Sequence, residues 1–197
     1  MARKLTAWLS IGSTYSYLTA MRIKEVVKKE DINLSIIPIS IRQIMKSMDN
    51  IPFPPSKQTK VNYMWRDIER RAALYKIPVP KVPAPYPLKE FDRANLVGIV
   101  MNDKGLYLDY FKYTYEEWFL NRNEAGSKQN LEVTLKKFGL DVKETIALAD
   151  TMEERYKENT TQALDFGVFG VPSFSFTNEI FWGDDRLEDA IRLAPQK

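Results

Sequence analysis

The chain opens with an alternation of apolar and polar residues that is typical of a β-strand. Apolar side chains occupy every second position from Leu5 to Ile11, which is the period expected of a strand with one buried face. After Gly12-Ser13-Thr14 the apolar positions recur at helical spacing from Tyr15 to Val27. A second short apolar run covers 34–39. The order strand, helix, strand predicts a βαβ unit with parallel strands.

The middle of the chain has mostly helical apolar spacing, from about 41 to 159. Helices are predicted near 61–75, 88–102, 105–121, 128–138 and 142–157, with Gly139 ending the fourth and Asp141 capping the fifth. A proline-rich segment at 78–87 is expected to be a wall or lid of the cleft between the two domains, or else a rigid surface connection. Seven aromatic residues crowd 107–119, and their spacing assigns most of them to the core, with one or two available to stack on a substrate.

The β pattern returns near the end of the chain. A helix at 160–166 is expected to end at Gly167, before strands at about 173–176 and 180–182 joined by a turn at Asn178-Glu179. A terminal helix follows to about 193. This order predicts an α/β protein with a thioredoxin-like fold, formed by 1–40 and 158–197 and interrupted by a large all-helical insertion domain at 41–157.

The composition excludes much chemistry, because the 197 residues include no cysteine and no histidine. A disulfide, a thiol redox cycle and the common zinc sites are therefore excluded. Ser-His-Asp and Cys-His catalysis are excluded in their ordinary forms. Metal catalysis through carboxylates alone stays open, although no metal site is predicted. Any reactive thiol must come from a ligand.

The charge pattern does not indicate a nucleic-acid or membrane partner. The 29 basic and 26 acidic residues leave a formal charge of +3 without a block of like charge. The chain has neither an apolar run of membrane-spanning length nor a signal-like segment at its start. We therefore expect a cytoplasmic protein that acts on small molecules.

Ser13 lies where the first strand gives way to the first helix. A helix N-terminus presents unpaired backbone N–H groups and the positive end of the helix dipole, which stabilise an anion. Thioredoxin-fold oxidoreductases place a reactive Cys-x-x-Cys at this point, whereas here Ser13 and Ser16 occupy its two ends. The simplest alternative is that Ser13 is only an N-cap, worth about 1 kcal/mol.

Four motifs resemble a known family: the sequences starting at Ser13, Asn50, Tyr63 and Phe166. These are Ser13-Thr14-Tyr15-Ser16-Tyr17-Leu18, Asn50 before a proline-containing stretch, the Tyr63–Pro78 segment, and Phe166–Pro172 followed by Phe181–Leu187. Together they are similar to the glutathione-dependent 2-hydroxychromene-2-carboxylate isomerases and the related kappa-class glutathione transferases, in the DsbA-like branch of the thioredoxin superfamily.

The resemblance implies a glutathione site and the residues that form it. Ser13 is expected to be catalytic, with its hydroxyl bonded to the glutathione sulfur, next to Thr14 and Tyr15. Pro172 is expected to be the cis-proline facing Ser13, and Val171 to pair with the glutathione backbone. Asn50, Asp184 and Asp185 correspond to positions that contact the ends of the tripeptide, although simple helix capping also explains the two aspartates.

Two residues beside this site depart from the family pattern. Thr14 replaces the usual proline, and Ser10 replaces an aspartate found in many members. Thr14 restores a backbone N–H and loosens the turn beside the proposed site, and Ser10 removes an acidic group there.

The resemblance implies an isomerase that moves an aromatic catabolic intermediate between cis and trans forms through a transient glutathione adduct. A kappa-like transferase that conjugates glutathione to electrophiles is the alternative, and a non-catalytic glutathione-binding module is the third possibility. A homodimer is also implied.

Overall fold

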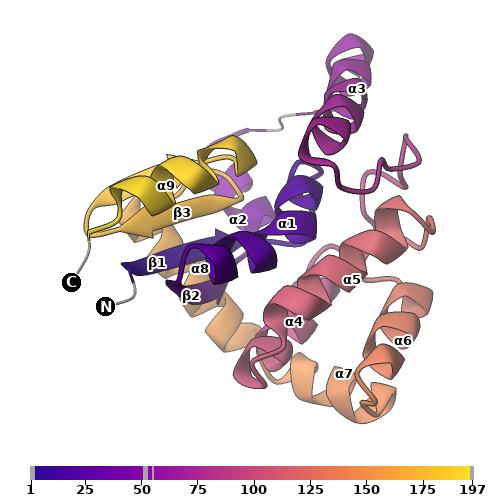
Figure 1. The fold of residues 1–197 in the computed structure, drawn as a ribbon. Helices are drawn as coiled ribbons and strands as arrows, with labels where there is room; N and C mark the ends of the chain where they lie inside the picture. Colours follow the sequence, from indigo (N-terminus) through magenta and orange to yellow (C-terminus); the bar gives the residue numbers. More distant parts are fainter. Residues whose placement is uncertain (1–2, 51–52, 55, 196–197) are drawn as a thin grey trace.

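The computed structural model describes residues 3–50, 53–54 and 56–195, and its core is a four-stranded sheet with the order β2-β1-β3-β4. The strands are β1 (Arg3–Leu9), β2 (Ile32–Pro38), β3 (Ser173–Phe176) and β4 (Glu179–Trp182). β1 runs parallel to β2 and antiparallel to β3, so the first and last parts of the chain form one sheet (Figure 1). This arrangement confirms the predicted thioredoxin-like α/β fold.

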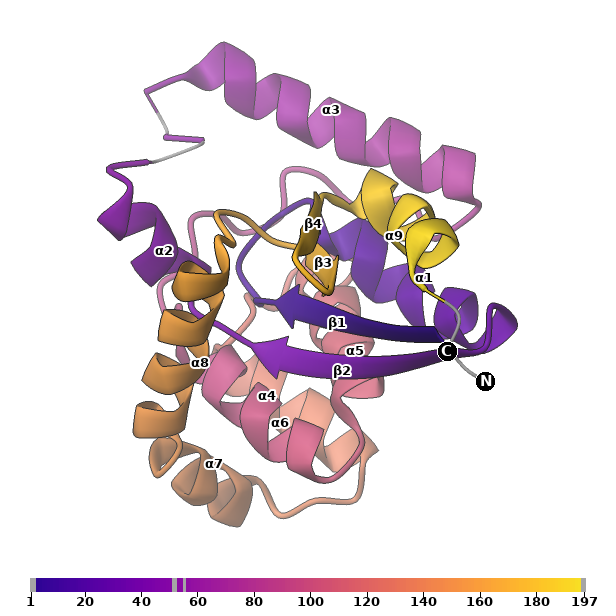
Figure 2. The same ribbon diagram turned by 90° about the vertical axis from the view of Figure 1, so that its left-hand side faces the viewer.

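The helices fill the chain between β2 and β3 and also flank the sheet. They are α1 (Ser16–Lys29), α2 (Ile41–Ser47), α3 (Gln58–Tyr75), α4 (Arg93–Asp103), α5 (Tyr107–Phe119), α6 (Lys128–Lys137), α7 (Val142–Asp150), α8 (Glu153–Phe166), a short 3₁₀ helix η1 (Asp184–Arg186) and α9 (Leu187–Leu193). Figure 2 shows α3 lying across one end of the molecule, on the far side of the strands from α4, α6 and α7.

The alternation in β1 places its side chains in two separate cores. Leu5, Ala7 and Leu9 point into the larger core, which includes side chains of α1, α3, α4, α5 and α9. Trp8 points to the opposite face, where it packs with side chains of α2 and α8. The larger core joins the sheet to the inserted helices, so the site at the end of β1 rests on both parts of the chain.

The aromatic residues of α5 are almost all core, as their spacing predicted. Six of them are at most 1% exposed: Tyr107, Tyr110, Phe111, Tyr115, Trp118 and Phe119. Their burial removes them as a stacking surface for a substrate. Of the seven aromatic residues, only Tyr113 is partly exposed, and it packs against Phe138.

The predicted helix ends are correct at several positions. Gly139 and Gly167 have positive φ angles of 67° and 92° just beyond α6 and α8, a conformation that favours glycine. The Asp141 side chain accepts a hydrogen bond of 2.9 Å from the Glu144 N–H and caps α7.

Other predicted boundaries are wrong. The helices expected at 142–157 and 160–166 are divided instead at Thr151-Met152, and α8 continues through 158–159. No proline or glycine marks that break in the sequence, and the predicted domain boundary between 157 and 158 falls inside α8. The final hairpin turns at Thr177-Asn178, one residue earlier than predicted, with a positive φ of 50° at Thr177.

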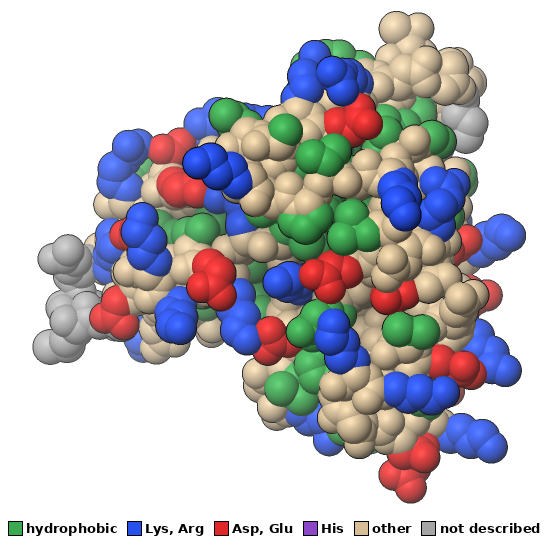
Figure 3. Space-filling view, turned by 45° about the vertical axis from the view of Figure 1, so that its right-hand side comes forward, with side chains coloured by type: hydrophobic (Ala, Val, Ile, Leu, Met, Phe, Trp, Pro, Cys, Tyr) green, Lys and Arg blue, Asp and Glu red, His purple; other side chains and the backbone are tan. Residues whose placement is uncertain are grey.

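The surface carries mixed charges. Figure 3 shows basic and acidic side chains interspersed over one face of the molecule, with only small apolar areas between them. Among the described residues, no helix has the length and apolar character needed to cross a lipid bilayer.

Candidate functional site

Ser13 lies in the short loop between β1 and α1 and faces the segment that precedes β3. Its hydroxyl donates a hydrogen bond of 3.3 Å to the Val171 carbonyl oxygen, 158 residues further along the chain. The N-cap of α1 is Tyr15, and no side chain caps that helix. The capping role considered for the Ser13 hydroxyl is therefore wrong.

The backbone around Ser13 presents several N–H groups that are not used within the protein. Those of Ser13, Thr14 and Tyr15 have no acceptor among the described residues, and the first helical bond runs from the Ser16 N–H to the Ser13 carbonyl at 3.2 Å. Such groups at the start of a fourteen-residue helix favour a bound anion. The half-buried Ser13 hydroxyl is thus placed beside an anion-stabilising helix end.

Two buried side chains from the inserted helices hold this loop. The Asn95 amide accepts a hydrogen bond of 2.6 Å from the Ile11 N–H and donates one of 2.9 Å to the Ile11 carbonyl. The Tyr115 hydroxyl donates to the Ser13 carbonyl at 2.7 Å and accepts from the Gly12 N–H at 3.4 Å. Because both side chains are fully buried, they fix the position of the loop without reaching a ligand. The sequence pattern assigned Tyr115 only to the core and gave Asn95 no role.

Thr14 and Tyr15 connect the loop to α3. The buried Thr14 hydroxyl lies 2.9 Å from the Met64 sulfur, a weak acceptor, so threonine here makes a contact that proline lacks. The Tyr15 hydroxyl donates to the Asp67 carboxylate at 3.1 Å. Burial and then the negative charge of Asp67 raise the pKa of Tyr15 above its usual value. Tyr15 is therefore a neutral hydrogen-bond donor at physiological pH.

The segment opposite Ser13 has the predicted cis-proline. The Val171–Pro172 peptide bond is cis, and the Pro172 carbonyl accepts a hydrogen bond of 2.9 Å from the Gly183 N–H. The Val171 N–H has no acceptor among the described residues. An extended peptide is the kind of ligand that would pair with this free edge.

Asp184 is not open to a ligand through its side chain. Its carboxylate accepts hydrogen bonds of 2.8 Å from the Thr19 hydroxyl and 3.0 Å from Arg22 Nε, and the residue is 5% exposed. Arg22 also pairs with Glu188 and lies 4.3 Å from the centre of the Tyr75 ring. Asp184 therefore joins α1 to the end of β4.

Glu188 is the exposed member of this cluster. Burial raises the pKa of Glu188, but the hydrogen bond and the positive charge of Arg22 outweigh it and hold the pKa below its usual value.

Asp185 differs from Asp184 because its side chain is accessible. It forms ion pairs with Arg71 at 3.5 Å and with Arg186 at 3.2 Å, and 39% of its side chain is exposed. Exposed ion pairs of this kind are weak. The Asp185 carboxylate is thus available to a cationic group at the same end of α3 that carries Arg71.

Asn50 and Ser10 are the remaining residues that the sequence singled out. Asn50 is exposed after α2, and its described contact is a backbone bond to the Met45 carbonyl at 2.9 Å. Among the described residues, Asn50 forms no hydrogen bond or ion pair with another predicted site residue. Ser10 is fully buried, and its hydroxyl accepts a hydrogen bond of 3.4 Å from the Ile41 N–H.

The arrangement therefore combines a serine hydroxyl, free N–H groups at a helix start and a free peptide edge. These features suit the thiol-bearing tripeptide that the motifs predict, because a helix start would stabilise a thiolate and a free edge would pair with an extended backbone. With no cysteine in the chain, the reacting sulfur would come with the ligand.

Comparisons with known proteins agree with this fold. A family model described as the DSBA-like thioredoxin domain matches residues 4–192. The chain is 27% identical over 191 residues to a 2-hydroxychromene-2-carboxylate isomerase of Pseudomonas sp. (strain C18), covering 93% of this chain and 87% of that protein. It is 24% identical to the protein of the same name in Sphingobium xenophagum, covering 95% and 96%.

Solved structures give the same result for the fold. A 2-hydroxychromene-2-carboxylate isomerase structure superposes with a TM-score of 0.82 at 23% identity, covering 94% of this chain and 91% of that one. A probable DsbA oxidoreductase from Streptomyces coelicolor superposes with a TM-score of 0.68 at 14% identity, covering 99% and 93%. The resemblance inferred from the motifs is confirmed.

Proposed function

The chain belongs to the DsbA-like thioredoxin domain family, and on this basis we propose that it is a glutathione-dependent isomerase of the 2-hydroxychromene-2-carboxylate isomerase type. The observation that carries the proposal is the Ser13 hydroxyl, which lies 3.3 Å from the Val171 carbonyl at the cis-proline in a chain without cysteine. The names of the similar proteins support the reaction class.

The chain's own residues would orient glutathione and stabilise its thiolate. When bound, glutathione supplies a thiol that adds to a conjugated double bond and leaves again after rotation, so it is not consumed. The Ser13 hydroxyl would turn from the Val171 carbonyl to the sulfur, and the free N–H groups at 13–15 would face the same charge. The role of Ser13 is that of a hydrogen-bond donor and not of a nucleophile.

Other residues would position the tripeptide. Val171 offers a free N–H for the glutathione backbone, and Asp185 offers a carboxylate for its ammonium group. Asn50 is proposed to contact the other end of the ligand. Asp184 is proposed to act indirectly, because Thr19 and Arg22 already occupy its carboxylate.

Product analysis with the purified protein tests this function. The hydroxychromene acid is incubated with the protein, with and without glutathione, and the isomer and the thiol are both quantified. Isomerisation that needs glutathione and returns all of it supports the proposal. Isomerisation at the same rate without glutathione contradicts the dependence on the cofactor.

The same experiment distinguishes the alternatives. A stable glutathione adduct indicates a kappa-like transferase, and binding of glutathione without any product indicates a binding module. The homodimer and the cytoplasmic location implied by the resemblance stay predictions.

A further inference from the structure

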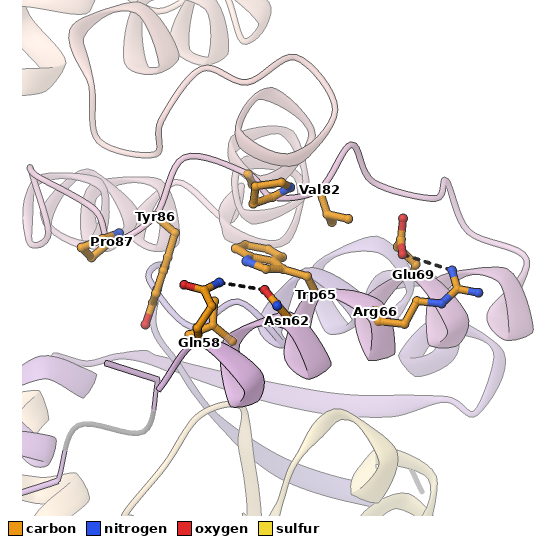
Figure 4. A pocket seen from close by; sticks show the side chains of 11 residues that line it. Gln58, Asn62, Trp65, Arg66, Glu69, Val82, Tyr86 and Pro87 are labelled. Carbon is orange, nitrogen blue, oxygen red and sulfur yellow. Dashed lines mark hydrogen bonds and ion pairs between the residues drawn. The ribbon is translucent and has the colours of Figure 1, made fainter. Parts of the chain in front are cut away.

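A cavity of about 450 Å³ lies between α3 and the proline-rich segment that follows it (Figure 4). Its volume falls within the range of small-molecule sites, about 300–1,000 Å³. It is lined by side chains of α3 and by residues between Val82 and Pro87. The proline segment is thus a wall of this cavity. Its predicted role as a wall or lid of the substrate cleft between the domains stays a prediction.

This cavity and the Ser13 site lie on opposite sides of α3. Along that helix Gln58, Asn62, Trp65 and Glu69 line the cavity. The α3 residues two positions further along the chain face the Ser13 site. Their contacts show this: Met64 with Thr14, Asp67 with Tyr15, and Arg71 with Asp185. Two residues correspond to about 200° of rotation in an α-helix. The cavity is therefore a separate site and includes none of the residues proposed to hold glutathione.

An aromatic surface forms the floor of the cavity. Trp65 is 6% exposed, and its indole ring meets the Tyr86 ring edge to face at 6.1 Å and 85°. The Trp65 indole N–H has no acceptor among the described residues, although the indoles of Trp8 and Trp118 both have one. Figure 4 shows the Trp65 ring between Tyr86 and Val82. The half-buried Tyr86 ring offers a flat ligand ring a surface beside the Trp65 edge, and the Trp65 N–H offers a donor to an acceptor on that ligand.

The proline wall is held in place from the rest of the protein. Arg122 donates a hydrogen bond of 2.9 Å to the Pro83 carbonyl, and the Trp118 indole donates one of 2.7 Å to the Pro85 carbonyl. The Tyr86 hydroxyl donates to the Phe53 carbonyl at 3.4 Å. Since its backbone is anchored at these points, the cavity is formed before any ligand arrives, which lowers the entropy cost of binding.

The rim of the cavity carries one cation and one anion, Arg66 and Glu69. Arg66 pairs with Glu69 at 3.2 Å, but 66% of the Arg66 side chain is exposed and such i,i+3 surface pairs are weak. A carboxylate that binds the guanidinium with two hydrogen bonds is a stronger partner. The second rim contact, from the Gln58 amide to Asn62 at 2.7 Å, is uncharged.

We propose that this α3–proline cavity binds a planar aromatic carboxylate, with the ring against Trp65 and the acid at Arg66. The Trp65 indole N–H supplies a second donor to an oxygen of the ligand. This site needs neither glutathione nor Ser13, so it stands independently of the proposed catalytic function.

Nuclear magnetic resonance of the four tryptophan indole N–H groups tests the proposal, with 2-naphthoate as the probe. Trp65→Phe identifies the Trp65 resonance. We expect 2-naphthoate to shift that resonance saturably, with a dissociation constant on the order of 0.1–1 mM for a ligand of this size. 2-Naphthalenemethanol, which lacks the charge, and cyclohexanecarboxylate, which lacks the flat ring, should each bind at least about tenfold more weakly. Equal binding of either compound, or no saturable shift, overturns the proposal.

Variants at exposed positions locate the ligand. Asn62→Tyr fills the rim and should abolish the shift, whereas Thr59→Tyr, on the same helix outside the cavity lining, should leave it unchanged. Arg66→Gln should weaken the binding of 2-naphthoate by at least about tenfold and leave the binding of 2-naphthalenemethanol unchanged. Ser13→Ala should have no effect. Binding that survives Asn62→Tyr but is lost in Ser13→Ala would place the probe at the Ser13 site and overturn the inference.

Discussion

Replacing Ser13 with alanine should change chemistry much more than stability. The hydroxyl makes one long hydrogen bond, 3.3 Å to the Val171 carbonyl, and it caps no helix. The bonds from Tyr115 and from the Ser16 N–H go to the Ser13 carbonyl, which alanine retains. We therefore expect the free energy of unfolding to fall by less than about 0.5 kcal/mol.

The effect on bound glutathione should be larger. A hydrogen bond to a charged group contributes about 1.5–3 kcal/mol, and one pKa unit corresponds to about 1.36 kcal/mol. Loss of the Ser13 hydroxyl should therefore raise the pKa of the bound thiol by about one to two units. At neutral pH the rate should fall about 10- to 100-fold through the thiolate fraction, while glutathione affinity changes little.

The assay is a titration of the ultraviolet absorbance of the bound thiolate against pH, together with melting curves. Ser16→Ala is the matched control, because the Ser16 hydroxyl is fully buried and has no partner among the described residues. The control should keep the thiol pKa of the original protein. An unchanged thiol pKa in Ser13→Ala would refute the catalytic role, and a loss of about 1 kcal/mol in stability would contradict the small effect on folding expected here.

Three further changes test the surroundings of the site. Tyr115→Phe removes the 2.7 Å hydrogen bond to the Ser13 carbonyl, and it should lower the melting temperature by about 3–6 °C and reduce the rate of isomerisation. A variant as stable and as active as the original protein would exclude the anchoring role of Tyr115. Arg22→Met leaves the Asp184 carboxylate buried without its cation and should cost about 3–5 kcal/mol in urea unfolding. Adding Asp184→Asn should recover part of that loss, and a double variant no more stable than Arg22→Met would contradict the pairing. Because the pKa of Glu188 is lowered in the folded state, its pairing stabilises the protein above the ordinary glutamate pKa of about 4.3 and is lost as the pH falls below it. Stability curves of Glu188→Gln should be flatter over that acid range, and parallel curves would rule out the effect.

The elements with regular patterns could be predicted from the sequence. The alternation from Leu5 to Ile11 identified β1, and Gly167 identified the end of α8. Both features are set by residues close together in the chain, so the sequence shows them directly. The division between α7 and α8 at Thr151-Met152 was missed because no proline or glycine marks it in the sequence.

The candidate site was predictable only where a motif marks it. Ser13 and Pro172 were identified in this way, and their proximity is confirmed by the bond between Ser13 and Val171. Asn95 was missed because nothing local distinguishes an asparagine that clamps a distant loop from one at the surface. Tyr115 was correctly assigned to the core, but its spacing says nothing about where a buried hydroxyl points.

The bonds that hold the Ser13 loop have a consequence for the order of folding. They join residues 84, 102 and 158 positions apart in the chain, through Asn95, Tyr115 and Val171. Contacts between such distant positions form slowly, because loop closure must precede them. During synthesis the strand, helix and strand at the start leave the ribosome long before Val171 does. We therefore expect a nascent or refolding chain to gain its helices first, and its ability to hold a ligand at Ser13 only with the last step of assembly.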